Sequence, residues 1–417
     1  TPMLVISGWW DMTPDEALIT FQDLQTRTEI GVREHHKLLM GPWSHSTVDH
    51  LHQGAWVFPA AVSEAKRETL EFLNHWLMQD EVNYYDRPPV RYFDLGTDDF
   101  LEADSWPPTD NQERHLYFVG EQLSDSAPTS PDDSRVFEYD PRNPVPTLAG
   151  RVFVNFLTAG PGSLVPLDGR TDMLVYETDV LTEPVEMRGY IQTNVFMSTD
   201  RLDTDVSVIL ADVFPDGEAR FITDAIRRLR FREGFTHAQL GLPWEVYELE
   251  IPMQSMSATF LPGHRIRLYV SGSNFPRFDR NLNNGGEMYV AGDTLISTTT
   301  IYQDELRPSS LVFASPQVAL ASNSDQGNID SSQPKTSELK VAAFPNPFNA
   351  ATKVEVTLPR TEALSLELYN VMGQRVKVIA SGMYPAGMHE FSVDGSQFTS
   401  GVYFLRTAIP SNSVDVQ

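Results

Sequence analysis

The chain has 417 residues, a formal net charge of -26 and no cysteine. Domains of about 150 residues are usual, so a chain of this length is expected to hold two or three of them. The acidic balance argues against nucleic-acid binding, because a polyanion would be repelled. Without cysteine there is no disulfide framework and no cysteine-ligated metal site, and no apolar run reaches the roughly 18 residues of a transmembrane helix.

The first part of the chain alternates strand and helix signals. Residues 3–6 are a continuous apolar run, typical of a strand buried on both faces of a parallel sheet, and residues 37–40 are expected to form the next buried strand. Between them, Thr13, Pro14 and Glu16 predict a helix start, as the cap, the first helical position and the partner in a capping box.

A longer helix is expected over residues 63–77, where Leu70, Leu73 and Leu77 share one side. A further extended segment follows at residues 88–93. The order strand, helix, strand, helix indicates the last part of a doubly wound α/β sheet.

Two motifs follow these runs and contain the candidate catalytic residues. Gly8-Trp9-Trp10-Asp11 follows the first run, and Gly41-Pro42-Trp43-Ser44-His45 follows the second. An Asp and then a His, each just past a buried strand, is the order in which α/β-hydrolases supply the second and third members of a Ser-His-Asp triad. Neighbouring parallel strands bring both loops to one edge of the sheet, where Asp11 should accept a hydrogen bond from His45.

The nucleophile of such a triad is expected upstream of this chain. A serine hydroxyl becomes a good nucleophile when a neutral imidazole accepts its proton, and a carboxylate then stabilises the imidazolium. No Gly-x-Ser-x-Gly elbow occurs in the 417 residues, and the chain begins at Thr1-Pro2. We therefore expect the C-terminal part of a larger secreted serine hydrolase, inactive without the upstream Ser.

Each candidate residue has an alternative role. A single Asp after a strand is usually a turn or cap residue, and a single His beside Trp usually packs in a loop. The prediction therefore depends on Asp11 and His45 together with their motifs. Trp10 and Trp43 flank the pair; they either bind substrate, by lining the acyl or leaving-group pocket, or pack the loops onto the sheet. No metal and no cofactor are expected.

From about residue 115 to 313 the pattern changes to many short runs separated by Gly, Pro, Asp and Asn. Runs at this spacing predict an antiparallel sandwich or jelly roll. A polar stretch at residues 315–336 has little to bury and predicts a flexible linker. Beyond it, Val354, Val356 and Leu358 alternate with polar positions and predict a smaller β-sandwich.

The predicted fold class is therefore multi-domain: an incomplete α/β-hydrolase with its C-terminal strands and helices, a β jelly roll, and a C-terminal Ig-like β-sandwich. The hydrolase part is predicted at residues 1–110, the jelly roll (galactose-binding-like) at 111–314, the flexible linker at 315–337 and the last domain at 338–417.

Three polar clusters have both structural and binding alternatives. A loop in which a hydrogen-bonded turn is favoured over calcium binding comprises Asp279, Asn281, Asn283 and Asn284. A basic cluster expected to form internal salt bridges rather than to bind an anion comprises Arg227, Arg228, Arg230 and Arg232. The spacing His50-x-His52 is that of a metal pair, but no placed carboxylate or cysteine accompanies it.

Further phrases of the first 313 residues carry a resemblance. They are Pro88-Pro89-Val90-Arg91-Tyr92-Phe93, Glu102-Ala103-Asp104-Ser105-Trp106-Pro107-Pro108, Leu261-Pro262-Gly263-His264-Arg265-Ile266-Arg267-Leu268 and Ser273-Asn274-Phe275-Pro276-Arg277-Phe278. With the motifs that end in Asp11 and His45, they resemble the cocaine esterase and Xaa-Pro dipeptidyl-peptidase (CocE/NonD) group of acyl hydrolases. The resemblance implies an α/β-hydrolase domain followed by a jelly roll, and Asp11 and His45 as triad residues. It also implies that the Ser and the oxyanion-hole residues precede this chain.

The last domain carries a second resemblance. Its phrases are Phe344-Pro345-Asn346-Pro347-Phe348-Asn349, Leu368-Tyr369-Asn370-Val371-Met372-Gly373-Gln374 and Ser400-Gly401-Val402-Tyr403-Phe404. They resemble the type A sorting domain of type IX secretion substrates. The resemblance implies export across an outer membrane, a secreted or cell-surface location, and the type IX secretion machinery as a partner.

Two functions from different classes follow. The first is a secreted serine hydrolase that cleaves a small-molecule ester or a peptide, of the acyl ester or X-Pro dipeptidyl type, through a covalent acyl-enzyme. The second is a non-catalytic surface or glycan-binding protein that uses the jelly roll, with the hydrolase part as scaffold. An upstream Gly-x-Ser-x-Gly in a strand-turn-helix context would favour the first.

Overall fold

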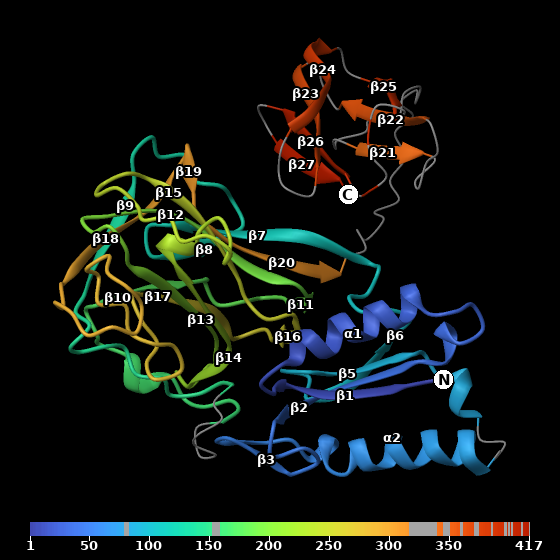
Figure 1. The fold of residues 1–417 in the computed structure, drawn as a ribbon. Helices are drawn as coiled ribbons and strands as arrows, with labels where there is room; N and C mark the ends of the chain where they lie inside the picture. The colour runs from blue at the N-terminus through green and yellow to red at the C-terminus, as the bar shows by residue number, and fades with distance from the viewer. Residues whose placement is uncertain are drawn as a thin grey trace, which may run out of the picture. The chain divides into compact units, whose positions relative to one another are not determined.

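The computed structural model of the protein describes residues 1–78, 83–151, 159–316, 340–344, 351–358, 362–370, 375–384, 387–395, 398, 401, 403–409 and 412–416. The chain divides into two compact units, Thr1–Leu320 and Ala321–Gln417 (Figure 1). The predicted linker at residues 315–337 falls almost entirely outside the described residues.

A four-stranded sheet holds the first part of the chain. Its strands, in spatial order, are β1 (Leu4–Trp10), β2 (Lys37–Ser44), β5 (Val90–Asp94) and β6 (Asp99–Ala103). Strands β1, β2 and β5 are parallel, and β6 is antiparallel to β5. Every residue of β2 is buried, since α1 (Pro14–Arg27) and α2 (Glu64–Leu73) lie on opposite sides of the sheet (Figure 1).

Helix α1 begins at Pro14, as predicted, but the capping box is wrong. Thr13 occupies the N-cap position and makes no side-chain hydrogen bond to the helix. The buried residues of α1 are instead Pro14, Leu18 and Phe21, which face the sheet. Packing, together with the fixed backbone angle of Pro14, therefore sets the start of this helix.

Helix α2 is capped by a residue distant in the sequence. The carboxylate of Asp49 accepts hydrogen bonds from the backbone N–H groups of Ala65 at 2.7 Å and Lys66 at 2.9 Å, where the positive end of the helix dipole favours an anion. The helix is thus tied at its first turn to the segment that follows β2. The side shared by the predicted leucines is largely exposed, at 50%, 41% and 73% for Leu70, Leu73 and Leu77.

Short elements complete this part and the connections beyond it. Strand β3 (His52–Gln53) pairs with β4 (Trp56–Val57) in a small hairpin. Single helical turns lie at Arg33–His35, Pro59–Ala61, Asn74–Met78, Asn83–Asp86, Val165–Leu167 and Leu229–Phe231. In the part of the chain that the structure describes, no helix is long and apolar enough to cross a membrane.

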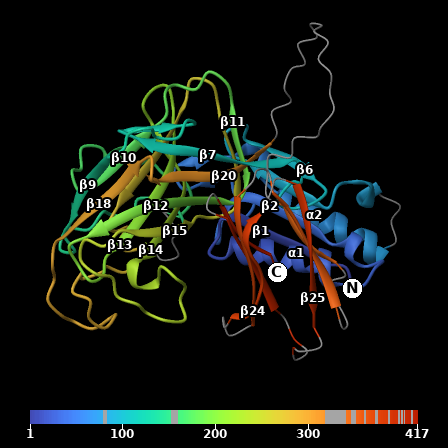
Figure 2. The same cartoon turned by 90° about the horizontal axis from the view of Figure 1, so that it is seen from above.

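Residues 111–316 form what we call the β-domain, built on a twelve-stranded sheet. Its path is β14-β13-β17-β10-β8-β7-β20-β12-β18-β19, with β15 on β12 and β9 on β18. The strands are β7 (Asn111–Val119), β8 (Gln122–Ser124), β9 (Ser134–Tyr139), β10 (Met173–Glu177), β12 (Ile191–Thr199), β13 (Asp205–Val213), β14 (Ala219–Arg228), β15 (Tyr247–Pro252), β17 (Arg265–Ser271), β18 (Ser297–Asp304), β19 (Arg307–Pro308) and β20 (Ser310–Pro316). A separate pair joins β11 (Val185–Gly189) to β16 (Met256–Phe260). Strands β7 and β20 run side by side in both views (Figures 1 and 2).

One hydrophobic core runs from the four-stranded sheet into the β-domain. Backbone bonds cross the boundary, because Leu95 donates to the carbonyl of Ser257 at 3.2 Å and accepts from the N–H of Thr259 at 2.6 Å. The indole N–H of Trp10 also donates to the carbonyl of Ile222 at 3.1 Å. The β-domain therefore packs directly against the end of β1, where the candidate site lies.

The second unit has its own core and two sheets. One sheet has the order β21-β22-β25 and the other β24-β23-β26-β27. The strands are β21 (Lys340–Phe344), β22 (Ala351–Leu358), β23 (Glu362–Asn370), β24 (Arg375–Tyr384), β25 (Gly387–Asp394), β26 (Tyr403–Ile409) and β27 (Asn412–Val416). The predicted alternation is confirmed, since Val354, Val356 and Leu358 are buried in this core. Much of each quoted sorting phrase, including residues 345–349 and 371–374, lies outside the described residues.

Candidate active site

Asp11 and His45 meet beside the carboxyl ends of β1 and β2. Nδ1 of His45 lies 2.8 Å from Oδ1 of Asp11. An ionised carboxylate has no hydrogen to donate, so in this contact Nδ1 carries the hydrogen and Asp11 accepts it. The side chain of Asp11 is 18% exposed and that of His45 57%, so the carboxylate is sheltered while the imidazole faces outward.

A bulge in β2 places the two residues level with each other. Gly8 pairs with Gly41 and Trp10 pairs with Ser44, so two steps along β1 match three steps along β2. The extra residue advances β2 by one position, and the residues that follow the last pair are Asp11 and His45. A regular register would have set Asp11 opposite Ser44 instead. Bulges redirect side chains in this way beside functional sites.

The two glycines of the motifs are explained by Trp43. A Cβ added at Gly8 would lie 2.2 Å from the carbonyl oxygen of Trp43, and one at Gly41 would lie 2.3 Å from its indole ring. No other residue type fits at either position without moving the backbone or the indole. Gly8 therefore permits a close approach of β1 to β2, and Gly41 makes room for the indole of Trp43 within β2.

Trp10 and Trp43 lie in the packed interior. Trp10 is 2% exposed and Trp43 0%. The Trp10 ring lies 6.0 Å from the Phe58 ring, and the Trp43 ring lies 6.4 Å from the Phe100 ring. These are packing contacts, and substrate binding by either indole stays a prediction.

Asp11 is held by its own strand end. Its Oδ1 also accepts the backbone N–H of Met12 at 2.6 Å, its backbone N–H donates to the carbonyl of Gly8 at 3.0 Å, and the hydroxyl of Ser7 lies 3.4 Å from Oδ2. The carboxylate is thus oriented by neighbours in the sequence as well as by His45.

Other histidines of this part have different surroundings. His36 is fully buried, its Nδ1 accepts the backbone N–H of Met3 at 3.1 Å, and burial lowers its pKa. Among the described residues, no group of three or more His, Asp or Glu side chains is arranged to hold a metal ion. A residue that the sequence did not single out is Gln53, whose buried amide contacts the end of β2 and the segment that follows it.

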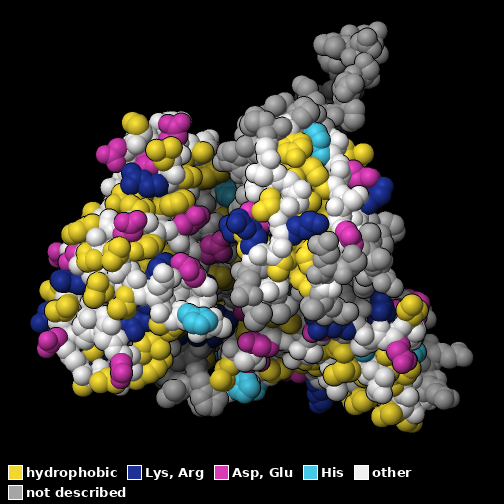
Figure 3. All heavy atoms as spheres, turned by 45° about the horizontal axis from the view of Figure 1, so that its top comes forward, with side chains coloured by type: hydrophobic (Ala, Val, Ile, Leu, Met, Phe, Trp, Pro, Cys, Tyr) yellow, Lys and Arg dark blue, Asp and Glu magenta, His cyan; other side chains and the backbone are white. Residues whose placement is uncertain are grey.

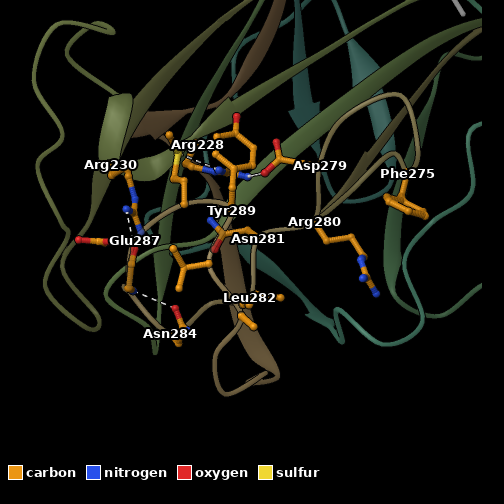
Figure 4. A pocket seen from close by; sticks show the side chains of 14 residues that line it. Arg228, Arg230, Phe275, Asp279, Arg280, Asn281, Leu282, Asn284, Glu287 and Tyr289 are labelled. Carbon is orange, nitrogen blue, oxygen red and sulfur yellow. Dashed lines mark hydrogen bonds and ion pairs between the residues drawn. The ribbon is translucent and has the colours of Figure 1, made fainter.

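The β-domain contains a pocket of about 290 Å³ beside the loop of Asx residues (Figure 4). The amide of Asn281 donates to Asp203 at 2.9 Å and to Asp205 at 2.8 Å. Arg228 forms a bidentate pair with Asp205, and Arg230 pairs with Asp203 at 2.7 Å. The loop is therefore hydrogen-bonded and this part of the basic cluster forms internal salt bridges, as predicted. The dashed bond from Arg228 to Asp279 in Figure 4 extends the same network.

Basic side chains elsewhere in the β-domain also contact acidic residues within the fold. The sequence His264-Arg265-Ile266-Arg267 at the start of β17 contacts acids within the fold: His264 lies 2.8 Å from Asp212, and Arg267 lies 2.5 Å from Glu177. Acidic, basic and hydrophobic side chains are interspersed over the face of the β-domain at the left of Figure 3. These basic side chains thus serve contacts within the fold.

Two families match separate parts of the chain. Residues 83–312 match the X-Pro dipeptidyl-peptidase C-terminal non-catalytic domain. Residues 342–415 match the secretion system C-terminal sorting domain. Asp11 and His45 precede the first of these ranges. The sorting domain indicates secretion through the type IX system, to the cell surface or the extracellular space.

Individual relatives agree with the family match. Cocaine esterase of Rhodococcus sp. is 34% identical over 300 residues, which cover 69% of this chain and 51% of that protein. A putative serine esterase of Mycobacterium bovis is 26% identical over 266 residues, 58% of this chain and 41% of that protein. The chain thus spans about half the length of these curated relatives or less.

Solved structures show the same fold. An aminopeptidase from a marine sediment archaeon, Thaumarchaeota archaeon, has a TM-score of 0.68 and 26% identity, covering 76% of this chain and 55% of that one. An α-amino acid ester hydrolase has a TM-score of 0.66 and 25% identity, covering 75% and 55%. The chain therefore belongs to the X-Pro dipeptidyl-peptidase C-terminal domain family of the CocE/NonD group, and it ends in a type IX secretion sorting domain.

Proposed function

We propose that this chain is the C-terminal part of a secreted serine hydrolase in which Asp11 and His45 are two members of a Ser-His-Asp triad. The observation that carries the proposal is the 2.8 Å contact between Nδ1 of His45 and Oδ1 of Asp11 beside the carboxyl ends of two adjacent parallel strands. Ligand and catalytic sites of α/β folds form at that edge of the sheet.

The chemistry assigned to each residue follows from this contact. Asp11 fixes the tautomer of His45, so Nε2 is the ring nitrogen that serves the serine. Nε2 takes the hydroxyl proton as serine Oγ attacks the carbonyl carbon, and returns it to the leaving alcohol or amine as the scissile bond breaks. Water then repeats the sequence on the acyl-enzyme, releasing the acid. Asp11 stabilises the imidazolium in both halves of the reaction.

The topology of the four-stranded sheet is consistent with a nucleophilic serine on a strand upstream of this chain. Among the described residues β1 forms one edge of the four-stranded sheet, and an edge strand presents unpaired backbone groups that a further strand can bind. We accordingly assign residues 1–110 to the last part of an α/β-hydrolase domain and the β-domain to a jelly roll. The two sheets of the second unit are assigned to an Ig-like sandwich.

Burial supports the packing role among the two predicted for Trp10 and Trp43. Both indoles are buried in the core beside the strand ends that carry Asp11 and His45, where they pack these ends onto the rest of the fold. Residues that contact the acyl group would then come mainly from segments other than these two motifs.

The names of the relatives indicate which class of substrate to propose. They include a cocaine esterase, an α-amino acid ester hydrolase and an aminopeptidase, which act on esters and on an amide. We propose a small ester or a short peptide as substrate, and the type IX secretion machinery as the partner of the sorting domain. One triad serves both bond types, because the acyl-enzyme step is the same.

A serine-directed probe tests the assignment. In the protein that joins this chain to its upstream segment, a fluorophosphonate should label one serine, and His45→Ala should abolish labelling and hydrolysis. His50→Ala is the matched control, since it removes a second exposed histidine from the same loop and should leave both signals intact. Unchanged hydrolysis in His45→Ala would overturn the proposal.

A further inference from the structure

The segment that carries His45 folds around one buried side chain, Gln53. This residue is 0% exposed. Its Oε1 accepts the backbone N–H of Ser44 at 3.0 Å and the hydroxyl of Thr47. Its Nε2 donates to the carbonyls of Thr47 at 2.6 Å and His50 at 3.1 Å. We call residues 44–50, which these bonds close, the histidine loop.

The amide of Gln53 uses its full hydrogen-bonding capacity on this loop. A primary amide offers two donors and two acceptor sites, and all four are engaged. A fully satisfied buried polar network is rigid and specific to one arrangement. Because Ser44 immediately precedes His45, the bond to its N–H fixes the backbone from which the imidazole projects.

Gln53 is itself held by the β-domain, through the hairpin of residues 52–57, which we call the anchor hairpin. Gly54 has φ of 54°, and a Cβ there would lie 2.2 Å from the carbonyl oxygen of Pro161. The next residue, Ala55, donates its N–H to that carbonyl at 3.0 Å. The tip of the anchor hairpin thus rests directly on the backbone of the β-domain.

A buried arginine packs against the other end of the anchor hairpin. The guanidinium of Arg220 in β14 lies 4.9 Å from the ring of Trp56 and 4.9 Å from the ring of Phe58. Its side chain is 5% exposed, which strengthens cation–π attraction. Trp56 also stacks on Phe214 of the β-domain at 5.7 Å.

We propose that Gln53 is a positioning residue that holds the imidazole of His45 over Asp11, and that the β-domain contributes to the reaction by fixing the anchor hairpin. The inference rests on the proposed function, because it takes His45 as the catalytic base. Gln53 contacts no reacting group; it acts by keeping the histidine loop in one conformation.

The first test observes His45 directly in the chain of 417 residues. Proteins with ¹⁵N-labelled histidine give separate imidazole signals, and His45→Ala assigns the signal of His45. Gln53→Met keeps the side-chain volume and removes all four hydrogen bonds, so exchange of the Nδ1 proton of His45 should accelerate by about tenfold. Gln303→Met is the matched control, because Gln303 is also 0% exposed and makes three hydrogen bonds, to Tyr176, Gly120 and Asp133 of the β-domain.

The second test measures turnover in the protein that includes the upstream segment. Gln53→Met should lower kcat by about 100-fold, the cost of a small misplacement of a catalytic group, with KM within about twofold. Gln303→Met should leave kcat within about twofold of the wild type. If Gln53→Met does not fold, Thr47→Val replaces it; by removing the hydroxyl that bonds Gln53 and lies 2.7 Å from the hydroxyl of Ser44, it should accelerate the same exchange about threefold.

The outcomes separate the two proposals. If Gln53→Met, or Thr47→Val in its place, changes neither the exchange of His45 nor kcat beyond the Gln303→Met control, the positioning role is overturned. If His45→Ala retains its turnover, the proposed function fails, while proton exchange at His45 still decides whether Gln53 orders the histidine loop.

Discussion

Nδ1 of His45 lies 2.8 Å from Oδ1 of Asp11 although the two residues are 34 positions apart. Their meeting depends on strand register, because the extra residue of β2 between Gly41 and Ser44 brings His45 level with Asp11. A substitution that shifts this register, or that removes the carboxylate of Asp11, should therefore change the position or the tautomer of the His45 imidazole.

Asp11→Asn should leave the fold intact and reduce turnover. An amide at this position can present its N–H₂ to Nδ1, which favours the wrong tautomer of His45. In serine proteases the equivalent change lowers kcat by about 10⁴. The measurement is kcat for a chromogenic ester in the protein with its upstream segment. Asp23→Asn, on the exposed side of α1, is the control and should behave as the wild type.

Gly8→Ala should destabilise the first unit and loosen the site. Its Cβ would stand 2.2 Å from a backbone oxygen of Trp43, and relief requires movement of β1 against β2. We expect a loss of about 3 kcal/mol in the free energy of unfolding, at the upper end for overpacking, measured by urea denaturation. The control is Gly286→Ala, whose nearest neighbour is the side chain of Asn284 at 3.1 Å; equal losses in the two variants would contradict the argument.

The sequence predicted the parts of this site that depend on local pattern. Short apolar runs placed β1 and β2, and parallel strands bring their carboxyl ends together, so strand order predicted that Asp11 and His45 lie at the same edge; the bulge in β2 that sets them level was not predicted. The glycines of the two motifs stood in the sequence as well. The reason why glycine is needed at these positions, the close approach of Trp43, could be recognised only from the structure, which shows the bulge in β2.

The parts that could not be predicted depend on tertiary contacts. Gln53 lies in a short polar stretch with no apolar period, and its role depends on a hairpin that rests on Pro161, more than a hundred positions away. The capping box failed for a similar reason, because the burial of Leu18 and Phe21 and the angle of Pro14 suffice to start α1. Asp49, which caps α2, gave no signal either, since it stands 16 residues before the N–H that it binds.

The stability contributed by Asp94 should depend on pH. Its side chain is 0% exposed and accepts hydrogen bonds from the hydroxyls of Ser257 at 2.6 Å and Thr97 at 2.8 Å. Burial raises its pKa above the ordinary value of 3.8, against the opposing effect of these hydrogen bonds. Between the pKa of Asp94 in the unfolded state and its raised pKa in the folded state, the folded state therefore binds more protons than the unfolded state. The contribution is complete below the unfolded pKa and is lost as pH rises through the folded pKa.

Asp94→Asn should remove that dependence. The free energy of unfolding of the variant, relative to the wild type, should rise as pH increases from about 4 and level off above the raised pKa. Urea denaturation of both proteins across that range gives the difference. A difference that is constant with pH would show that Asp94 titrates alike in the folded and unfolded chain.

The buried pair of Asp205 and Arg228 should matter more than an exposed pair of the same type. Asp205 is 2% exposed and binds the guanidinium in bidentate fashion at 2.8 and 2.9 Å. Asp205→Asn leaves Arg228 with the partly exposed Asp279, and loss of one partner of a buried pair costs about 3–5 kcal/mol. Asp132→Asn is the matched comparison, because Asp132 is 88% exposed and lies 3.6 Å from Arg307, and it should cost less than about 1 kcal/mol. Comparable losses in urea denaturation would refute this ranking.

Removal of the sorting domain should abolish export and leave catalysis unchanged. The second unit has its own core, with Val356 at 0% exposure, so we expect the first unit to fold without it. The protein with its upstream segment, truncated before residue 338, should show the kcat of the intact protein in lysate and stay inside the cell, as cell fractionation would detect. Val356→Asp is the control at full length: a charge in that core should unfold the domain and block export equally. Normal surface delivery of the truncated protein would instead place the export signal outside the sorting domain.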